Sequence, residues 1–267
     1  HLGAETIKKK LPDITDFVRT YVKIEPINEP IPVQPTAHYA MGGIPTDVYG
    51  RVLSDEKNTV LPGVYAAGEA ACVSVHGANR LGTNSLLDIV VFGKRAGQSM
   101  LEYVSKTKST SISDNAADDL VNKINNLIEK EHTDEFSVGK IRNDLQESME
   151  ENAKIFRSEE TLSKQTEILE NLRERYENVT IFDKGKVFNT ELMEAIELDY
   201  LLDMSESTVA SALARKESRG AHSRQDFPDR DDSNFMKHSF AFKNGNSANL
   251  RYKDVELGKY EPMERKY

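Results

Sequence analysis

A strand, a glycine-rich loop and a long helix follow one another in the first half of the chain. The run VLPGVYAAGEA, rich in β-branched, aromatic and small residues, predicts a buried strand that ends at Gly68–Glu69. Residues 84–104 predict a long helix, with Asn84 or Ser85 as its cap and Asp88 in its first turn. Small and apolar residues predict a tightly packed face on this helix: Leu86, Ile89, Val90, Gly93 and Gly97. The sequence therefore predicts a βα unit.

The other stretches differ in character. Residues 1–25 predict the end of a helical segment around Pro12, and the prolines of 26–65 predict extended chain and turns. A polar linker at 105–115 precedes a mostly helical block, which predicts a small bundle. Its amphipathic patterns lie at 120–128, 141–149 and 162–176, with a further pair of helices over about 190–217. After Gly220 the tail is rich in Asp and Arg and predicts two short strands, HSFAFK and NLRYKDVEL.

Composition excludes several classes of function. The chain has 35 basic and 44 acidic residues, a net charge of −9, which argues against general nucleic-acid binding. A single cysteine, Cys72, excludes an intrachain disulfide, a cysteine-based zinc site and an iron–sulfur cluster held by this chain alone, and it favours a reducing compartment. No apolar run approaches the roughly 20 residues that cross a bilayer.

Two glycine-bearing segments carry residues suited to an anionic ligand. They are HYAMGG, which begins at His38, and the loop that runs through Arg80 into the helix at Asn84. A turn and an ordinary βα connection are the structural alternatives for these segments. A helix N-terminus presents free N–H groups and a positive dipole, and an arginine adds a fork that fits a carboxylate. His38 can donate a second charge-assisted hydrogen bond. The residues therefore predict a site for a small anion, beside an electron-rich ring.

Three segments together resemble one known family. HYAMGG, GVYAAGEAACVSVHGANRLGTNSLLD and KESRGAHSRQDFPDRDD are similar, in order and spacing, to motifs of the flavoprotein subunit of succinate dehydrogenase and fumarate reductase. The resemblance runs over essentially the whole chain, and its middle motif is highly specific. It implies FAD as cofactor and the interconversion of succinate and fumarate. The fold class it implies is an α+β fragment: the C-terminal part of a FAD-binding α/β domain, a helical bundle and a small C-terminal α/β tail.

The resemblance assigns the substrate side of the site to three residues. His38 and Arg80 match the family's ligands for a substrate carboxylate, and Thr83 falls where the family has a small residue that touches the dicarboxylate. Arg80 and His38 would clamp one carboxylate and so orient a substrate C–H bond toward flavin N5.

The cofactor side rests on three further positions. Glu69 matches the acid that binds the FAD sugar chain, and Ser85 and Leu86 match the backbone positions at the isoalloxazine ring. A helix N-terminus at Ser85 would stabilise the negative charge of reduced flavin.

The remaining candidates are expected to be structural. Cys72 is expected to be a buried thiol, and His76 to be packed or hydrogen-bonded locally. The third motif contributes basic residues that are expected to form an ion-pair network, with direct cofactor contact as the alternative: Arg219, His222, Arg224 and Arg230.

The resemblance also predicts that the chain is the C-terminal part of a longer subunit. It contains no G-x-G-x-x-G motif for the ADP half of FAD, and the family's capping-domain arginine, threonine and second histidine have no match in it. We expect 1–25 to be the end of the capping domain, 26–105 the C-terminal part of the FAD-binding domain, 106–217 the helical domain and 218–267 the tail. The isolated fragment would hold half of the site and should not turn over.

The sequence leaves alternatives to this assignment. L-aspartate oxidase shares HGANR but typically has cysteine where this chain has Met41, and it lacks the SRGAHSRQDFPDRDD tail. The direction of catalysis, succinate oxidation or fumarate reduction, stays open. A fragment that only docks an iron–sulfur subunit is the non-catalytic alternative.

With one cysteine, the enzyme needs an iron–sulfur partner subunit to pass electrons to quinone. The resemblance implies indirect attachment to membrane anchor subunits, at the cytoplasmic or matrix face.

Overall fold

The computed structural model describes residues 2–34, 36, 38–108, 111–245 and 247–263. The chain divides into two compact units, one of residues 1–37 and one of residues 38–267.

The N-terminal unit is helical. Helix α1 covers Ala4–Lys10, helix α2 covers Pro12–Phe17, and a π-helical turn continues over Val18–Val22. Pro12 begins α2 because its missing N–H costs nothing in the first turn, and the same residue breaks the helical run after α1. The predicted helical segment around Pro12 is therefore confirmed.

Two small pairs of strands precede the long helix in the second unit. Strand β1 (Ile44–Pro45) pairs in parallel with β4 (Ala71–Cys72), and β2 (Arg51–Leu53) pairs antiparallel with β3 (Val60–Tyr65). The predicted strand is present as β3, but the prediction that it is buried is wrong for the described chain. Its four middle residues are exposed, because β2 is its one partner strand and α3 covers it locally, through Tyr103 against Gly63.

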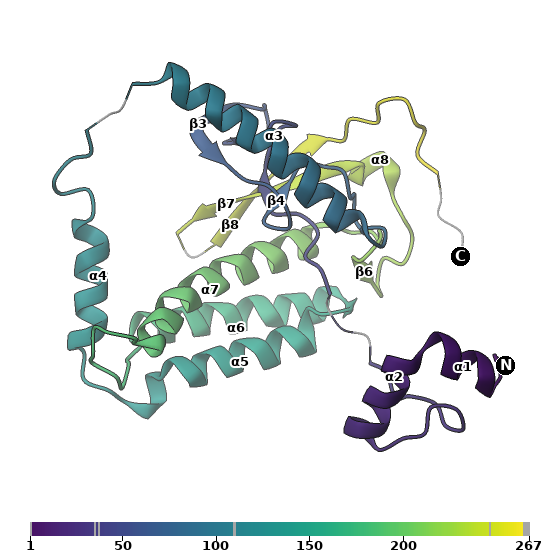
Figure 1. Ribbon diagram of the computed structural model, residues 1–267. Coiled ribbons are helices and arrows are strands. Elements are labelled where there is room, and N and C mark those ends of the chain that lie inside the picture. The colour runs from purple at the N-terminus through teal and green to yellow at the C-terminus, as the bar shows by residue number, and fades with distance from the viewer. Residues whose placement is uncertain (1, 35, 37, 109–110, 246, 264–267) are drawn as a thin grey trace. The chain divides into compact units, whose positions relative to one another are not determined.

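Helix α3 spans Asn84–Lys106, as predicted, but its environment differs from the prediction (Figure 1). Its N-cap is Thr83, which makes no side-chain capping bond, and Asp88 lies beyond the first turn. The predicted packed face is largely open in the described chain, although Ile89 Cγ1 lies 3.3 Å from the position of a Cβ built at Gly68. Leu86, Ile89 and Val90 are 67%, 49% and 68% exposed, and a Cβ built at Gly93 or Gly97 would meet nothing within 4 Å.

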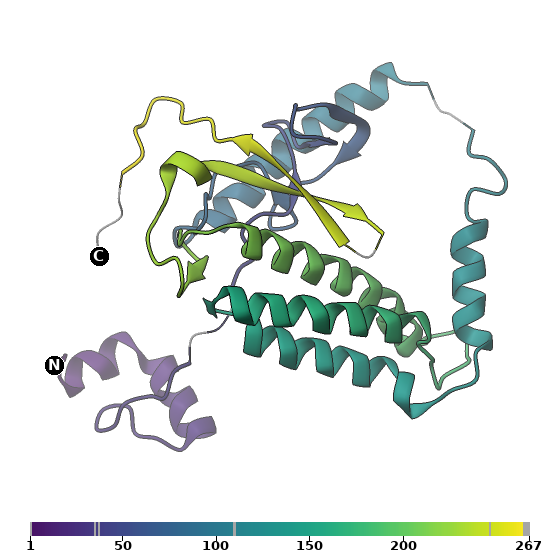
Figure 2. The same ribbon diagram turned by 180° about the vertical axis from the view of Figure 1, so that it is seen from behind.

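Four helices form the bundle. Helix α4 covers Asp118–Glu129, α5 covers Val138–Asn152, α6 covers Glu159–Glu177 and α7 covers Thr190–Ala214, with a 3₁₀ turn at Asp134–Phe136. Figure 2 shows α5, α6 and α7 side by side. The pair of helices predicted over 190–217 is wrong: α7 is one continuous helix, in a run with no proline or glycine to interrupt it. Fully buried side chains fill the core: Ile141, Leu162, Ala195, Leu198 and Leu202.

The tail returns to the bundle and to the strands. Strand β6 (Ser223–Arg224) pairs in parallel with β5 (Phe156–Arg157), which lies just before α6. After the short helix α8 (Asp232–Phe235), β7 (Lys237–Asn244) and β8 (Ser247–Asp254) form an antiparallel hairpin, which confirms the two predicted strands. The hairpin reaches back to the first half of the unit, where Ser74 Oγ lies 2.8 Å from His238 Nε2.

Helix and sheet are mixed, which agrees with an α+β fold. Within the described ranges, no helix combines the length and the apolar character needed to span a bilayer.

Candidate active site

Tyr39 joins the two glycine-bearing segments. Its ring lies 4.6 Å from the Arg80 guanidinium carbon in a cation–π contact, and 5.8 Å from the His76 ring in an edge-on contact. Burial, aided by the charges of Asp88 and Glu69, raises the pKa of Tyr39 above its ordinary value. The Arg80 guanidinium therefore stacks on the face of a neutral phenol ring.

His76 ties the same loop to helix α3. Its Nε2 lies 2.9 Å from Oδ2 of Asp88, which is almost completely buried. Asp88 is one of two buried residues of α3, and the pair fixes the ring against which Tyr39 packs. The expectation of a locally hydrogen-bonded His76 is confirmed.

Arg80 has an unused donor. Its Nε is buried and has no hydrogen-bond partner among the described residues, while its Nη1 reaches the carbonyl of Leu81 at 3.5 Å. An unpaired buried N–H of a charged guanidinium is costly unless an acceptor is supplied. A carboxylate is the acceptor whose charge and geometry suit it. His38 is exposed and precedes Tyr39 in the sequence, and no described residue is recorded as bonding its ring.

The backbone of the HYAMGG segment packs closely against Ala70, the residue that precedes β4. A Cβ at Gly43, whose φ is +120°, would lie 2.6 Å from the Ala70 carbonyl oxygen. Ile44 N–H donates to the same carbonyl at 2.9 Å, and the Ala40 N–H donates to Oε1 of Glu69 at 3.1 Å. The structure thus places Glu69 beside the segment that carries His38.

The start of α3 is backbone-strained. Thr83 has φ +69°, a left-handed conformation that is rare for a β-branched residue. Asn84 N–H donates to Leu81 O at 3.2 Å and Leu86 N–H to Thr83 O at 3.1 Å. Among the described residues, the N–H of Ser85 has no recorded partner. The first turn therefore leaves the Ser85 N–H free for a ligand and uses that of Leu86 internally. Such strain often marks functional positions.

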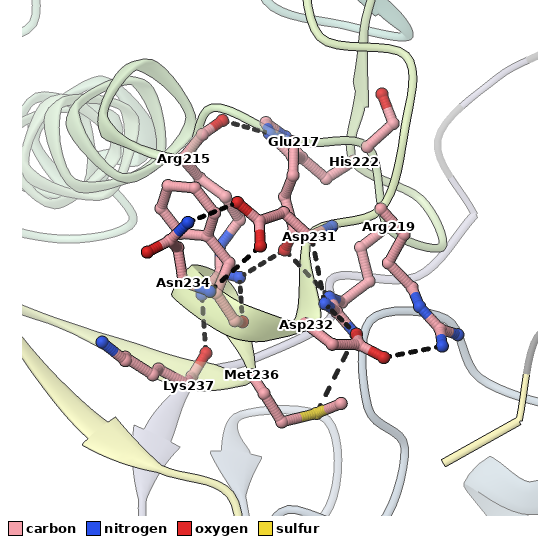
Figure 3. Close-up of polar contacts among 12 residues, drawn as sticks. Arg215, Glu217, Arg219, His222, Asp231, Asp232, Asn234, Met236 and Lys237 are labelled. Atoms are coloured by element: carbon pink, nitrogen blue, oxygen red, sulfur yellow. Dashed lines mark hydrogen bonds and ion pairs between the residues drawn. The ribbon is translucent and has the colours of Figure 1, made fainter.

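The third motif forms an ion-pair cluster, drawn in Figure 3. Glu217 is fully buried and accepts from Arg219 Nε and Nη2, both at 2.9 Å, from Arg215 Nη1 at 2.7 Å and from the Asp231 N–H at 2.8 Å. Although burial opposes it, these hydrogen bonds hold the pKa of Glu217 below its ordinary value. Asp232 accepts from both Arg219 and Arg230 at 2.7 Å.

Another arginine of the motif, Arg224, is buried against the bundle. Arg224 pairs with Asp226 at 2.7 Å and with Glu159 of α6 at 3.2 Å, and it donates to two carbonyls at the end of α7. The expected ion-pair network is confirmed by these contacts. His222 belongs to it, with Nδ1 at 3.0 Å from Arg157 Nη1 and Nε2 at 3.1 Å from the Arg215 carbonyl. Burial lowers the pKa of His222, which favours the neutral form of its ring.

Cys72 lies in β4 and is partly buried. Burial raises the pKa of its thiol, which agrees with the expected structural role because the reactive thiolate is disfavoured.

Three residues that organise this region were not predicted from the sequence to do so. Tyr39 and Asp88 stood inside the quoted motifs, but their roles depend on contacts between segments. Glu217 stood inside the third motif with no role assigned to it, yet it is the buried acceptor at the centre of the arginine cluster. A lone acid flanked by arginines two residues away on either side was the signal for it.

Comparison with known proteins defines the class. Residues 1–86 match the model of a FAD binding domain, and residues 142–267 match the model of the fumarate reductase flavoprotein C-terminal domain.

Full-length relatives agree with this class. The chain is 42% identical to a fumarate reductase flavoprotein subunit of Serratia, with 100% of the chain and 44% of the relative covered. It is 41% identical to the succinate dehydrogenase flavoprotein subunit of Rickettsia bellii, over 96% of the chain and 44% of that protein. A solved quinol fumarate reductase structure from E. coli superposes with a TM-score of 0.87 at 38% identity, covering 99% of this chain and 44% of that one.

The chain belongs to the family of flavoprotein subunits of succinate dehydrogenase and fumarate reductase. It spans a little under half the length of the relatives it matches.

Proposed function

We propose that the chain supplies one half of the active site of an FAD-dependent enzyme that interconverts succinate and fumarate. The observation that carries the proposal is Arg80: its guanidinium is stacked on Tyr39 and its Nε is buried without a described partner. A buried, oriented and unpaired arginine donor fits a carboxylate ligand.

His38, Arg80 and Thr83 form the substrate side in this proposal. Arg80 binds one carboxylate of the dicarboxylate, and His38, next to Tyr39, donates a second hydrogen bond to it. The stack on Tyr39 holds the guanidinium before substrate arrives, so less side-chain freedom is lost on binding. Thr83, at the strained cap of α3, offers a hydroxyl to the same ligand. Together these residues orient the substrate and keep it from rotating.

Glu69, Ser85 and Leu86 form the cofactor side. The free Ser85 N–H and the positive end of the α3 dipole fit the electron-rich edge of a flavin, and the exposed apolar side chain of Leu86 fits its ring. Glu69 fits a hydroxyl of the sugar chain, because one carboxylate oxygen accepts from Ala40 and the other has no recorded partner among the described residues. When bound, FAD supplies the hydride acceptor or donor for the reaction.

An iron–sulfur subunit is the proposed electron partner. The chain has one cysteine and cannot hold such a cluster alone, so electrons must leave the flavin through another protein. We place the subunit at the cytoplasmic or matrix face of a membrane, attached through partner subunits that exchange electrons with quinone. The proposal covers both directions of the reaction.

The test is Arg80→Lys in the full-length subunit within its complex. Lysine keeps the charge and loses the fork, at about 1.5–3 kcal/mol for each charge-assisted hydrogen bond lost. We expect kcat/KM for succinate to fall by roughly 100-fold, the equivalent of about 2.7 kcal/mol, with FAD still bound.

Arg95→Lys is the matched control, since Arg95 also stacks on a tyrosine, 5.2 Å from the Tyr49 ring, but lies on α3 away from the site. Activity within about threefold of wild type in Arg80→Lys would disprove the carboxylate role.

A further inference from the structure

The tail turn Ser218–His222 touches the backbone of the loop that carries Arg80. The Ala221 N–H donates to the carbonyl of Ala78 at 2.9 Å. Among the described residues, this is the one recorded backbone hydrogen bond that joins residues 77–80 to another segment. It bridges 143 residues of sequence, from the site loop to the third motif.

Gly220 makes this approach possible. A Cβ at Gly220 would lie 2.6 Å from both the carbonyl carbon and the oxygen of Ala78, and 2.9 Å from its Cβ. The first two atoms are backbone and cannot rotate aside, so any side chain at Gly220 must push the loop. Ala78 stands two residues before Arg80.

The turn is itself held rigidly. Arg219 and His222 exchange backbone hydrogen bonds of 2.8 and 3.0 Å across it. The Arg219 side chain is fixed by Glu217 and Asp232, as Figure 3 shows. The loop has two anchors of its own, the His76–Asp88 hydrogen bond and the stack of Arg80 on Tyr39, and the bond from Ala221 adds a third at Ala78. The turn therefore contributes to where the loop lies.

We propose that the turn Ser218–His222 positions Arg80 for carboxylate binding, by holding the Ala78 carbonyl. The inference rests on the proposed function of Arg80. Gly220 and Ala221 are positioning residues, since the contacts recorded for them in the described chain are with the backbone and Cβ of Ala78. The ion-pair cluster around Glu217 then has a role beyond fastening the tail.

The experiment compares two glycine variants in the full-length subunit within its complex. Gly220→Ala introduces the clash. Gly258→Ala is the matched control, because its φ is +63° against +59° and nothing lies within 4 Å of its Cβ position. Malonate, a dicarboxylate that is not oxidised, is titrated and its Kd measured from the flavin absorbance change. Flavin content and the thermal unfolding midpoint are measured in parallel.

We expect Gly220→Ala to raise the malonate Kd about tenfold with FAD retained, and Gly258→Ala to leave it unchanged. A malonate Kd in Gly220→Ala equal to that of the control would overturn the positioning role. Arg80→Lys separates the two proposals. If it also binds malonate as wild type, the proposed function fails, whereas weakened binding in Arg80→Lys alone refutes only the positioning.

Hydrogen exchange on the wild-type complex decides the case if Gly220→Ala does not assemble. Malonate should slow exchange of the amides in Ser218–His222, because the loop that accepts from Ala221 becomes ordered. The β7–β8 hairpin serves as the internal control. If malonate leaves the exchange rates of the Ser218–His222 amides unchanged, the inference is contradicted.

Discussion

Replacing Glu217 by glutamine tests the buried centre of the arginine cluster. The carboxylate accepts four hydrogen bonds, two on each oxygen: from Arg215 and Arg219 on Oε1, and from Arg219 and the Asp231 N–H on Oε2. An amide keeps one acceptor oxygen and turns an N–H₂ group toward the other two donors. Two bonds to a charged group are therefore lost, at about 1.5–3 kcal/mol each. Two guanidinium charges also lose their shared counter-charge.

We expect Glu217→Gln to lower the free energy of local opening of residues 215–224 by about 4 kcal/mol, within the range of roughly 3–5 kcal/mol for breaking a buried ion pair. The assay is native-state hydrogen exchange of the full-length subunit, since a multidomain protein has no single free energy of unfolding. Glu197→Gln, on the exposed side of α7, is the control and should change stability by less than about 0.5 kcal/mol. A change below roughly 1 kcal/mol in Glu217→Gln would show that the cluster does not hold the tail.

Two further predictions concern the site and its support. Thr83→Gly should relieve a left-handed backbone strain worth about 1–2 kcal/mol, so the thermal unfolding midpoint should stay equal or rise. Because the hydroxyl is lost, malonate binding should weaken severalfold. A lower midpoint together with unchanged malonate affinity would contradict both expectations. Burial lowers the pKa of His222, which faces Arg157, Arg215 and Arg224, so its contribution to stability is complete above the unfolded pKa near 6.5 and is lost as pH falls through the folded value. Opening of residues 215–224, corrected for intrinsic exchange rates, should increase between pH 7 and pH 5, by at most about tenfold per pH unit, and His222→Gln should flatten this dependence; an equal slope in the variant removes His222 as its source.

Local periodicity predicted the elements well. Helix α3, the helices α4 to α6 and the hairpin β7–β8 carry their apolar spacing within a few turns or residues, so neighbouring residues suffice to place them. The same reasoning divided α7 into two helices, because its apolar residues are not confined to one face. It also predicted a buried β3 and a packed face on α3. Periodicity marks a face that can be covered and does not say which segment covers it.

The site was predicted at the level of motifs and missed at the level of contacts. His38 and Arg80 stand in recognisable segments, but the ring that joins those segments belongs to Tyr39, and the histidine behind it is fixed by Asp88. The hydrogen bond between Ala221 and Ala78 joins two backbone segments that lie far apart in the sequence of the second unit. No local pattern encodes such a meeting. The need for glycine at position 220 is evident only from the position of the Ala78 carbonyl in the structure.

A density map of the full-length holoenzyme complex with malonate bound would test the role of Arg80 most directly. We predict a malonate carboxylate within hydrogen-bond distance, about 2.7–3.2 Å, of the Arg80 guanidinium, with Nε as one donor and His38 as a second ligand. Tyr39 should remain stacked on the guanidinium. Malonate bound elsewhere, with Arg80 Nε still lacking an acceptor, would contradict the central claim that this chain provides the carboxylate-binding half of the site.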